Sequence, residues 1–200
     1  MEAETPTIVQ VGDPVLRAPT SAVELDAIRR PDMHGLIQGM VAAMRKAPGI
    51  GLAAPQIGVS KRVIVIEDRP EMTAELPQQV LAEREREPRP LRVLINPVMT
   101  LVGDETRDFF EGCLSIRGYT AMVRRHREVK VSYRDERGDP QEWRPVGWQA
   151  RVMQHEYDHL ERVLYTDRMI ARSFMSIEEY KARYATKLVA DVKQELGIAQ

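Results

Sequence analysis

The stretch from Gln154 to His159, which reads QHEYDH, constrains this chain more than any other part of its sequence. Residues four apart lie on the same face of an α-helix, so the imidazoles of His155 and His159 can bind one metal ion. Glu156 directly follows the first histidine, where it can move a proton beside that metal. Apolar residues recur at helical spacing around the motif. We therefore expect a partly buried helix with a metal site rather than an exposed helix with two solvated histidines.

A catalytic site of the zinc type has three protein ligands and leaves a fourth position for water, so a third ligand is needed. No histidine follows His159. One candidate is Glu178 or Glu179, downstream of the motif. The other is Cys113, the single cysteine, upstream of it. A lone cysteine is commonly a small buried hydrophobe, but a thiolate with two imidazoles suits zinc or ferrous iron. The residues by themselves leave both candidates open.

Composition sets the broad class of protein. With 200 residues, 43% of them hydrophobic, the chain is long enough for one core, and we expect residues 1–200 to form a single catalytic domain. The net charge of -1 gives no sign imbalance that would point to a nucleic acid or an anionic membrane as a partner. The acidic N-terminus, MEAETPTIVQ, lacks the basic and apolar regions of a signal peptide, so we expect a cytoplasmic location.

The first half of the chain predicts one helix and one strand clearly. A helix is expected from Pro31 to the Pro48-Gly49 stop, with its recurring methionines in the core. Residues 62–67, RVIVIE, predict a partly buried strand. The charged, proline-containing segment 68–90 predicts a surface excursion with a short helix within residues 79–86.

The second half predicts strands followed by two helices. Residues 92–95 and 98–102 are strand-like and are separated by Asn96-Pro97, and residues 129–146 predict a hairpin. The motif helix is expected from Gly147 to about Val163, and one last amphipathic helix over residues 176–196. Strands and helices without regular alternation indicate an α+β fold.

Three stretches together resemble one known family. GIGLAAPQ (Gly49 to Gln56), EGCLS (Glu111 to Ser115) and QHEYDH (Gln154 to His159) match, in this order, the three signature motifs of peptide deformylase. Three ordered motifs are far more specific than HExxH alone, and the resemblance covers roughly Gly12 to Met169. It implies an α+β fold with small antiparallel or mixed sheets around a central HExxH helix, together with an N-terminal and a C-terminal helix.

The resemblance also implies roles for individual residues. Cys113, His155 and His159 would be the ligands of one divalent metal ion, iron(II) by family habit, with zinc, nickel or cobalt as alternatives. Glu156 would be the general acid and base. Gln56 and the backbone N–H of Leu114 would stabilise the oxyanion.

The implied reaction is hydrolysis of the formyl group from the N-terminal formylmethionine of a newly made polypeptide, with release of formate. The implied partner is therefore a nascent chain near the ribosome. Glycines at the site would let a peptide backbone approach closely, and apolar neighbours would form the methionine pocket or belong to the core. The substrate-binding residues that we expect are Ile50, Gly51, Gly112, Trp148 and Val152.

Two alternative functions remain open, and the sequence departs from the family pattern at two positions. An HExxH endopeptidase would use Glu178 or Glu179 as its third ligand, and a non-catalytic relative would keep the fold as a binding module. Arg117 stands where the family often has proline, which changes one substrate-facing edge. Arg162 stands where it often has glycine, and we expect this to lengthen the motif helix slightly.

Overall fold

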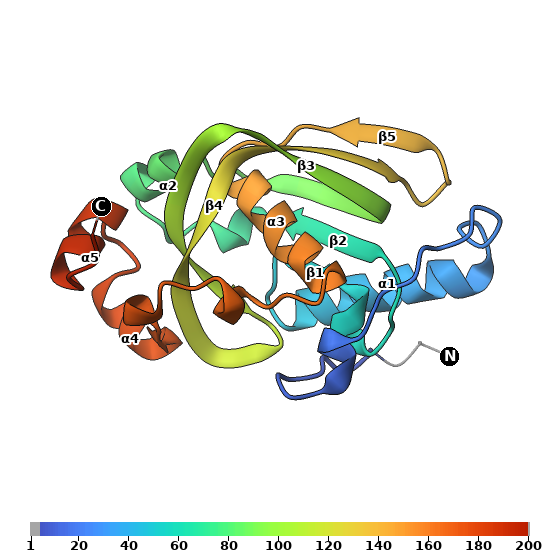
Figure 1. Cartoon of the computed structure of the whole chain (residues 1–200), viewed down its shortest axis with the longest axis horizontal. Helices are drawn as coiled ribbons and strands as arrows, with labels where there is room; N and C mark the ends of the chain where they lie inside the picture. The colour runs from blue at the N-terminus through green and yellow to red at the C-terminus, as the bar shows by residue number, and fades with distance from the viewer. Residues whose placement is uncertain (1–4, 200) are drawn as a thin grey trace.

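One antiparallel sheet forms the body of the protein, whose computed structural model describes residues 5–199. The strand order is β1-β2-β3-β4-β5, and β6 pairs with β4. The long hairpin of β3 and β4 curls across the molecule (Figure 1). The strands are β1 (Gly51–Ala53), β2 (Val63–Asp68), β3 (Arg89–Cys113), β4 (Ile116–Arg134), β5 (Pro140–Trp143) and β6 (Met175–Ser176). The predicted α+β class is confirmed, with the strands joined in one sheet.

Strand β3 runs through the Asn96-Pro97 pair, where the sequence predicted an interruption. Asn96 has a positive φ of 51°, and the pairing register with β4 shifts between Ile95 and Val98. The Asn96 side chain bonds the backbone N–H and carbonyl of Val23, which anchors this bulge to the N-terminal segment. Proline cannot donate to the ladder but is tolerated at a bulge, so the strand bends and continues.

Helix α3 (Trp148–Leu160) lies across the curled sheet and carries the QHEYDH motif (Figure 1). All its residues except Tyr157 are buried, because it packs against β1, β2 and β4. The helix ends at Leu160 and not near Val163, so the predicted end was wrong. Arg162 adopts a left-handed φ of 65° at the place where a glycine would cap the helix. The arginine therefore takes the capping conformation and does not lengthen the helix.

Helix α1 (Pro31–Lys46) begins and ends where the sequence predicted. Its methionines Met33, Met40 and Met44 are buried in a core cluster with Val63 and Val65 of β2, which confirms their structural role. In the charged excursion, a short helix α2 (Gln78–Arg84) forms as expected. The remaining single turns are η1 (Pro14–Arg17), η2 (Ala54–Ile57), η3 (Pro70–Met72), η4 (Tyr165–Asp167) and η5 (Ala171–Ser173).

The C-terminal segment forms two short helices where the sequence predicted one. These are α4 (Ile177–Arg183) and α5 (Val189–Glu195). Apolar side chains of both helices pack around Phe110 and Met122 of the long hairpin. The Glu83 carboxylate accepts the Val189 N–H at 2.9 Å and so caps α5 from α2. Both helices therefore cover the same part of the hairpin.

Within residues 5–199, none of the helices combines the length and the apolar character that crossing a bilayer requires.

The left-handed backbone conformation of Arg162 indicates that a substitution by glycine should stabilise the protein. Arg162→Gly is expected to raise the free energy of unfolding by roughly 0.5–1 kcal/mol, because a side chain in this conformation costs more than the added freedom of an unfolded glycine. Denaturant unfolding followed by circular dichroism measures the change. Arg162→Ala is the control, since alanine removes the guanidinium but keeps the strain. If Arg162→Ala raised the free energy of unfolding as much as Arg162→Gly, the effect would come from the lost charge.

The buried carboxylate of Asp108, which pairs with Arg124 and with Lys193 of α5, predicts acid sensitivity. The hydrogen bond from Arg124, followed by that from Lys193, outweighs burial and lowers the pKa of Asp108 from 3.8 to about 2. The folded pKa lies below the unfolded one, so the stabilisation is complete above about pH 4 and is lost as pH falls towards 2.

Asp108→Asn should therefore lower the free energy of unfolding at pH 6, and the gap to wild type should narrow as pH approaches 2. Urea unfolding at several pH values measures this gap. Asp104→Asn is the matched control, because Asp104 is exposed and has no ion pair among residues 5–199. A gap for Asp108→Asn that does not change with pH would contradict the assignment.

Candidate metal centre and active site

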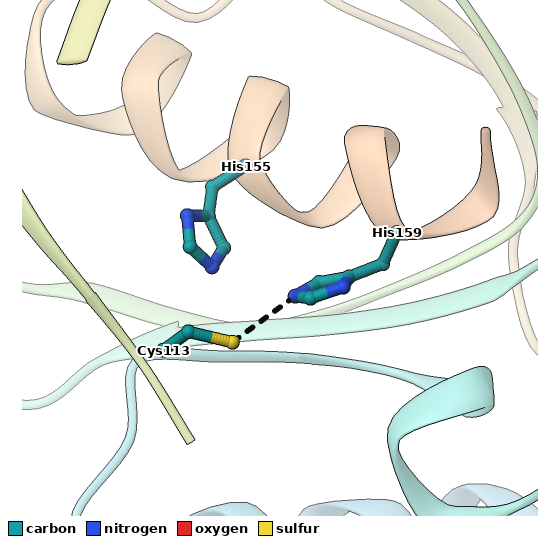
Figure 2. Close-up of side chains that lie close together, drawn as sticks. All are labelled: Cys113, His155 and His159. Carbon is teal, nitrogen blue, oxygen red and sulfur yellow. Dashed lines mark hydrogen bonds between the residues drawn. The ribbon is translucent and has the colours of Figure 1, made fainter. Parts of the chain in front are cut away.

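Three side chains from two elements converge on one point. The end of β3 supplies Cys113, and α3 supplies His155 and His159 from one face (Figure 2). Their ligand atoms all lie within 4.8 Å of one another, and the Cys113 Sγ is 3.4 Å from the His159 Nε2. Among the described residues this is the one such group found, and neither Glu178 nor Glu179 belongs to it.

The donor set fits a divalent metal ion such as zinc or iron(II). One thiol and two imidazoles are borderline-soft donors, and three protein ligands leave a position for water. Burial lowers the pKa of His159 well below its ordinary value, which keeps this imidazole neutral and able to bind a metal. His155 Nδ1 lies 2.8 Å from the Glu111 Oε2, so its other nitrogen is left for the cluster.

Glu111 is the centre of a buried charge network. Its carboxylate accepts two hydrogen bonds from Arg125 of β4, at 2.9 and 3.0 Å, and one from Arg151 of α3, at 2.6 Å. Burial would raise the pKa of Glu111, but the Arg125 charge and the His155 hydrogen bond lower it well below the ordinary value. The carboxylate therefore stays charged and orients the imidazole of His155.

Asp158 of α3 extends this network to Arg168. Arg125 donates to the Asp158 Oδ2 at 2.5 Å, and Arg168 binds both carboxylate oxygens at 2.8 and 3.0 Å. Glu111 and Asp158 are thus paired with Arg125, Arg151 and Arg168, which come from three different segments of the chain.

Glu156 lies beside the cluster and has unused hydrogen-bonding capacity. The residue is 4% exposed, and its Oε2 has no hydrogen-bond partner within residues 5–199. Burial raises the pKa of Glu156 to about 7. A carboxyl group in this state can accept and return a proton near neutral pH.

Gln56 points its amide at the cluster from η2. Its Oε1 accepts the Ala53 N–H at 2.8 Å, which fixes the orientation of the side chain. Its Nε2 then lies 3.4 Å from the Cys113 Sγ and 3.3 Å from the Ser115 Oγ. A buried amide donor is thus held next to the three ligand atoms.

Leu114 follows Cys113 in the turn between β3 and β4. Its carbonyl accepts a hydrogen bond from the Gln10 side chain at 3.0 Å. Its N–H has no acceptor among the residues that the structure describes. The turn therefore presents a free backbone donor one residue from the thiol.

A cavity of about 450 Å³ opens over these groups. All five expected substrate-binding residues line it, as do Gln56, Leu114 and Glu156. The sequence interpretation missed other lining residues from distant segments: Met72, Arg86, Phe110, Arg151, Ile177 and Lys181. Arg151 lies four residues before His155 on α3, so helical spacing could have indicated it, whereas only the tertiary arrangement brings in the others.

A thiol and two imidazoles around one point, beside an unpaired carboxyl group at the base of a cavity, define a candidate metal-dependent hydrolase. The sequence model of the polypeptide deformylase family matches residues 5–174. The chain therefore belongs to the polypeptide deformylase family, whose members are metalloenzymes that remove the formyl group from N-terminal methionine.

Individual relatives agree with this membership. Peptide deformylase 1A, chloroplastic, of Solanum lycopersicum is 45% identical over 86% of this chain and 62% of its own length. Peptide deformylase 3 of Streptomyces avermitilis is 43% identical over 96% of this chain and 84% of its own length. The solved structure of a Synechococcus elongatus peptide deformylase in complex with actinonin has a TM-score of 0.70 and 36% identity, and the match covers 98% of this chain and 91% of that one. The chain thus spans less than two thirds of the Solanum protein.

The close approach of Gly51 to Glu156 predicts a selective loss of activity. A Cβ at Gly51 would lie 2.3 Å from the Glu156 Oε1 and 2.7 Å from its Cδ. Gly51→Ala must therefore displace the carboxyl group, and hydrolysis of a formyl-Met peptide is expected to fall about 10²-fold.

The matched control is Gly35→Ala, because a Cβ at Gly35 on α1 meets nothing within 4 Å. Formate release measures activity, and thermal unfolding measures stability. An unchanged rate for Gly51→Ala would show that Glu156 tolerates displacement.

Proposed function

We propose that this chain, as one catalytic domain over residues 1–200, hydrolyses the formyl group from the N-terminal formylmethionine of newly made polypeptides and releases formate. One observation carries the proposal: the Cys113, His155 and His159 ligand atoms lie within 4.8 Å of one another in a chain of the deformylase family. A cysteine ligand supports this reaction over the endopeptidase alternative, whose third ligand would be Glu178 or Glu179.

Cys113, His155 and His159 would hold one divalent ion, which we propose to be iron(II), with zinc, nickel or cobalt as alternatives. When bound, the ion lowers the pKa of a water molecule and polarises a carbonyl oxygen. The remaining steps fall to side chains of this chain. Glu111 fixes the ring of His155, and its own charge is balanced by Arg125 and Arg151.

Glu156 is proposed to move the proton. It accepts a proton from the attacking water as the oxygen bonds to the formyl carbon. It then gives that proton to the amide nitrogen as the carbon–nitrogen bond breaks. The products are formate and a polypeptide with a free amino-terminal methionine. The unpaired Oε2 and the pKa of about 7 support this role, because the group is free to take and to release a proton.

Gln56 and Leu114 are proposed to stabilise the negative charge that grows on the formyl oxygen. The Gln56 Nε2 is already held by the Ala53 contact at its other end, and the Leu114 N–H is unengaged among the described residues. Donors that are fixed beforehand cost no reorganisation during the reaction. Loss of one such donor typically lowers the rate ~10²–10³-fold.

The substrate is proposed to lie along β1. This strand lies at one end of the sheet order and pairs with β2 alone among the described strands, so its outer edge could accept a peptide backbone. Gly112 leaves room for that backbone, because a Cβ there would meet only the Tyr119 carbonyl, at 3.8 Å, whereas the missing side chain of Gly51 leaves room for Glu156. Ile50, Trp148 and Val152 line the same cavity and would form the pocket for the methionine side chain.

The chemistry of the substrate also supports a proposal for where in the cell the enzyme acts. Formylmethionine is present at the start of newly made chains, so we propose that the enzyme acts close to the ribosome, in the cytoplasm. We propose no direct contact with nucleic acid or with a membrane, consistent with the balanced net charge of -1.

Two variants separate proton transfer from metal binding. Formate release is measured anaerobically from a short formyl-Met peptide, with iron or nickel supplied. Glu156→Gln is expected to keep the metal and lose about 10²–10⁴-fold in rate, because only the proton carrier is removed. Cys113→Ala is expected to lose the metal, which elemental analysis measures.

The control is the double substitution of Glu178 and Glu179 by alanine, which should keep both metal and activity. Undiminished formate release from Glu156→Gln would contradict the mechanism. Metal retained by Cys113→Ala but lost by the double variant would favour the endopeptidase alternative instead.

A further inference from the structure

A second cavity continues from the one over the metal centre. It has a volume of about 570 Å³ and shares the lining residues Ala47, Cys113, Leu114 and Ile177 with the first. A polypeptide whose first residue lies at Cys113 therefore has two connected hollows through which its following residues can pass. We call the route along these two cavities the exit. The residues that border it can contact the substrate beyond its methionine.

Three exposed cations border this exit. Lys46, at the end of α1, and Arg117, at the start of β4, line the second cavity. Lys181 of α4 lines the first. None of the three has an ion pair or a side-chain hydrogen bond within residues 5–199, although most arginines near the site are paired. Arg117 is also the position at which the family often carries proline.

Among residues 5–199, the acidic side chains nearby do not neutralise these cations. No acidic residue of that range lines the second cavity. The two that line the first, Glu111 and Glu156, are buried, and Glu111 is already paired with Arg125 and Arg151. The exit is therefore positively charged at the surface, where a passing peptide meets it.

Helix α4 shows the same asymmetry. Ile177 and Lys181 lie four residues apart, on one face, and both line the first cavity. Glu178 and Glu179 line neither cavity, and Glu179 pairs with Arg183. The helix thus presents its unpaired cation to the exit and its acids elsewhere.

We propose that Lys46, Arg117 and Lys181 form a cationic rim that favours formyl-Met polypeptides with acidic side chains in the residues after the methionine. The proposal rests on the deformylase function proposed above and adds a substrate preference to it. Exposed charges interact weakly in water, by up to ~1 kcal/mol a pair, so the expected preference is about 3–10-fold and depends on salt.

The test compares three formyl peptides that differ only in charge. They are formyl-Met-Ala-Glu-Glu, formyl-Met-Ala-Gln-Gln and formyl-Met-Ala-Lys-Lys, each with an amidated C-terminus. Their kcat/KM for formate release should fall in that order at low salt, mainly through KM, and the differences should shrink at high salt. A fourth arm uses the Gln peptide with a free C-terminus, which separates a terminal carboxylate from an acidic side chain.

Variants assign the preference to the rim. In the triple variant Lys46→Gln/Arg117→Gln/Lys181→Gln, kcat/KM for the Glu peptide divided by kcat/KM for the Lys peptide should fall to near one. The single charge reversals Arg117→Glu and Lys181→Glu should each lower this ratio, which keeps the test decisive if the triple variant folds poorly. Arg183→Gln is the matched control on α4, because Arg183 lines neither cavity, and its ratio should equal that of wild type.

The outcomes separate the two proposals. Turnover of the Gln peptide with equal rates for all three peptides would overturn the cationic rim and leave the deformylase function intact. A preference that persists in the charge reversals would also overturn the rim. No formate from any peptide with metal-loaded protein would overturn the proposed function, and the rim with it.

Discussion

The buried carboxylate of Glu111 is the contact on which the rest of the site depends. It joins β3, β4 and α3 through hydrogen bonds to Arg125 and Arg151, and it holds the ring of His155. Each of these groups is charged or polar and lies out of water. Removing Glu111 would leave the buried Arg151 without an ion pair among residues 5–199, and breaking such a buried pair typically costs ~3–5 kcal/mol. The network therefore fixes where α3 lies against the sheet.

The same strand delivers the thiol to the metal centre. Glu111 and Cys113 are two residues apart on β3, and both side chains reach α3 across an irregularity of the strand between Gly112 and Cys113. Glu111 contacts His155, and Cys113 contacts His159. Since the helix and the strand are tied together by Glu111, the distance between the sulfur and the imidazoles follows from the packing.

Charge is arranged differently at the base and at the exit of the cavity. At the base, the ions are buried and paired, and they orient groups. At the exit, Lys46, Arg117 and Lys181 are exposed and have no ion pair among residues 5–199. Buried pairs are screened little by salt and hold geometry, whereas exposed charges act over a distance and are weakened by salt. The buried ions at the base can hold reacting groups in place, and the exposed cations at the exit can attract some substrates more than others.

The sequence by itself determined the features that depend on local spacing. The i, i+4 histidines, the extent of α1 and the hairpin of β4 and β5 follow from short-range periodicity and turn residues, and the ordered motifs identified the family and the cysteine. Only the tertiary structure decided that β3 continues through Asn96, that the C-terminal segment divides into α4 and α5, and which arginines balance Glu111. It also placed Arg117 and Lys181 on two cavities that share Ile177. Long-range pairing brings these groups together, and pairing between distant segments leaves no periodic signal in either of them.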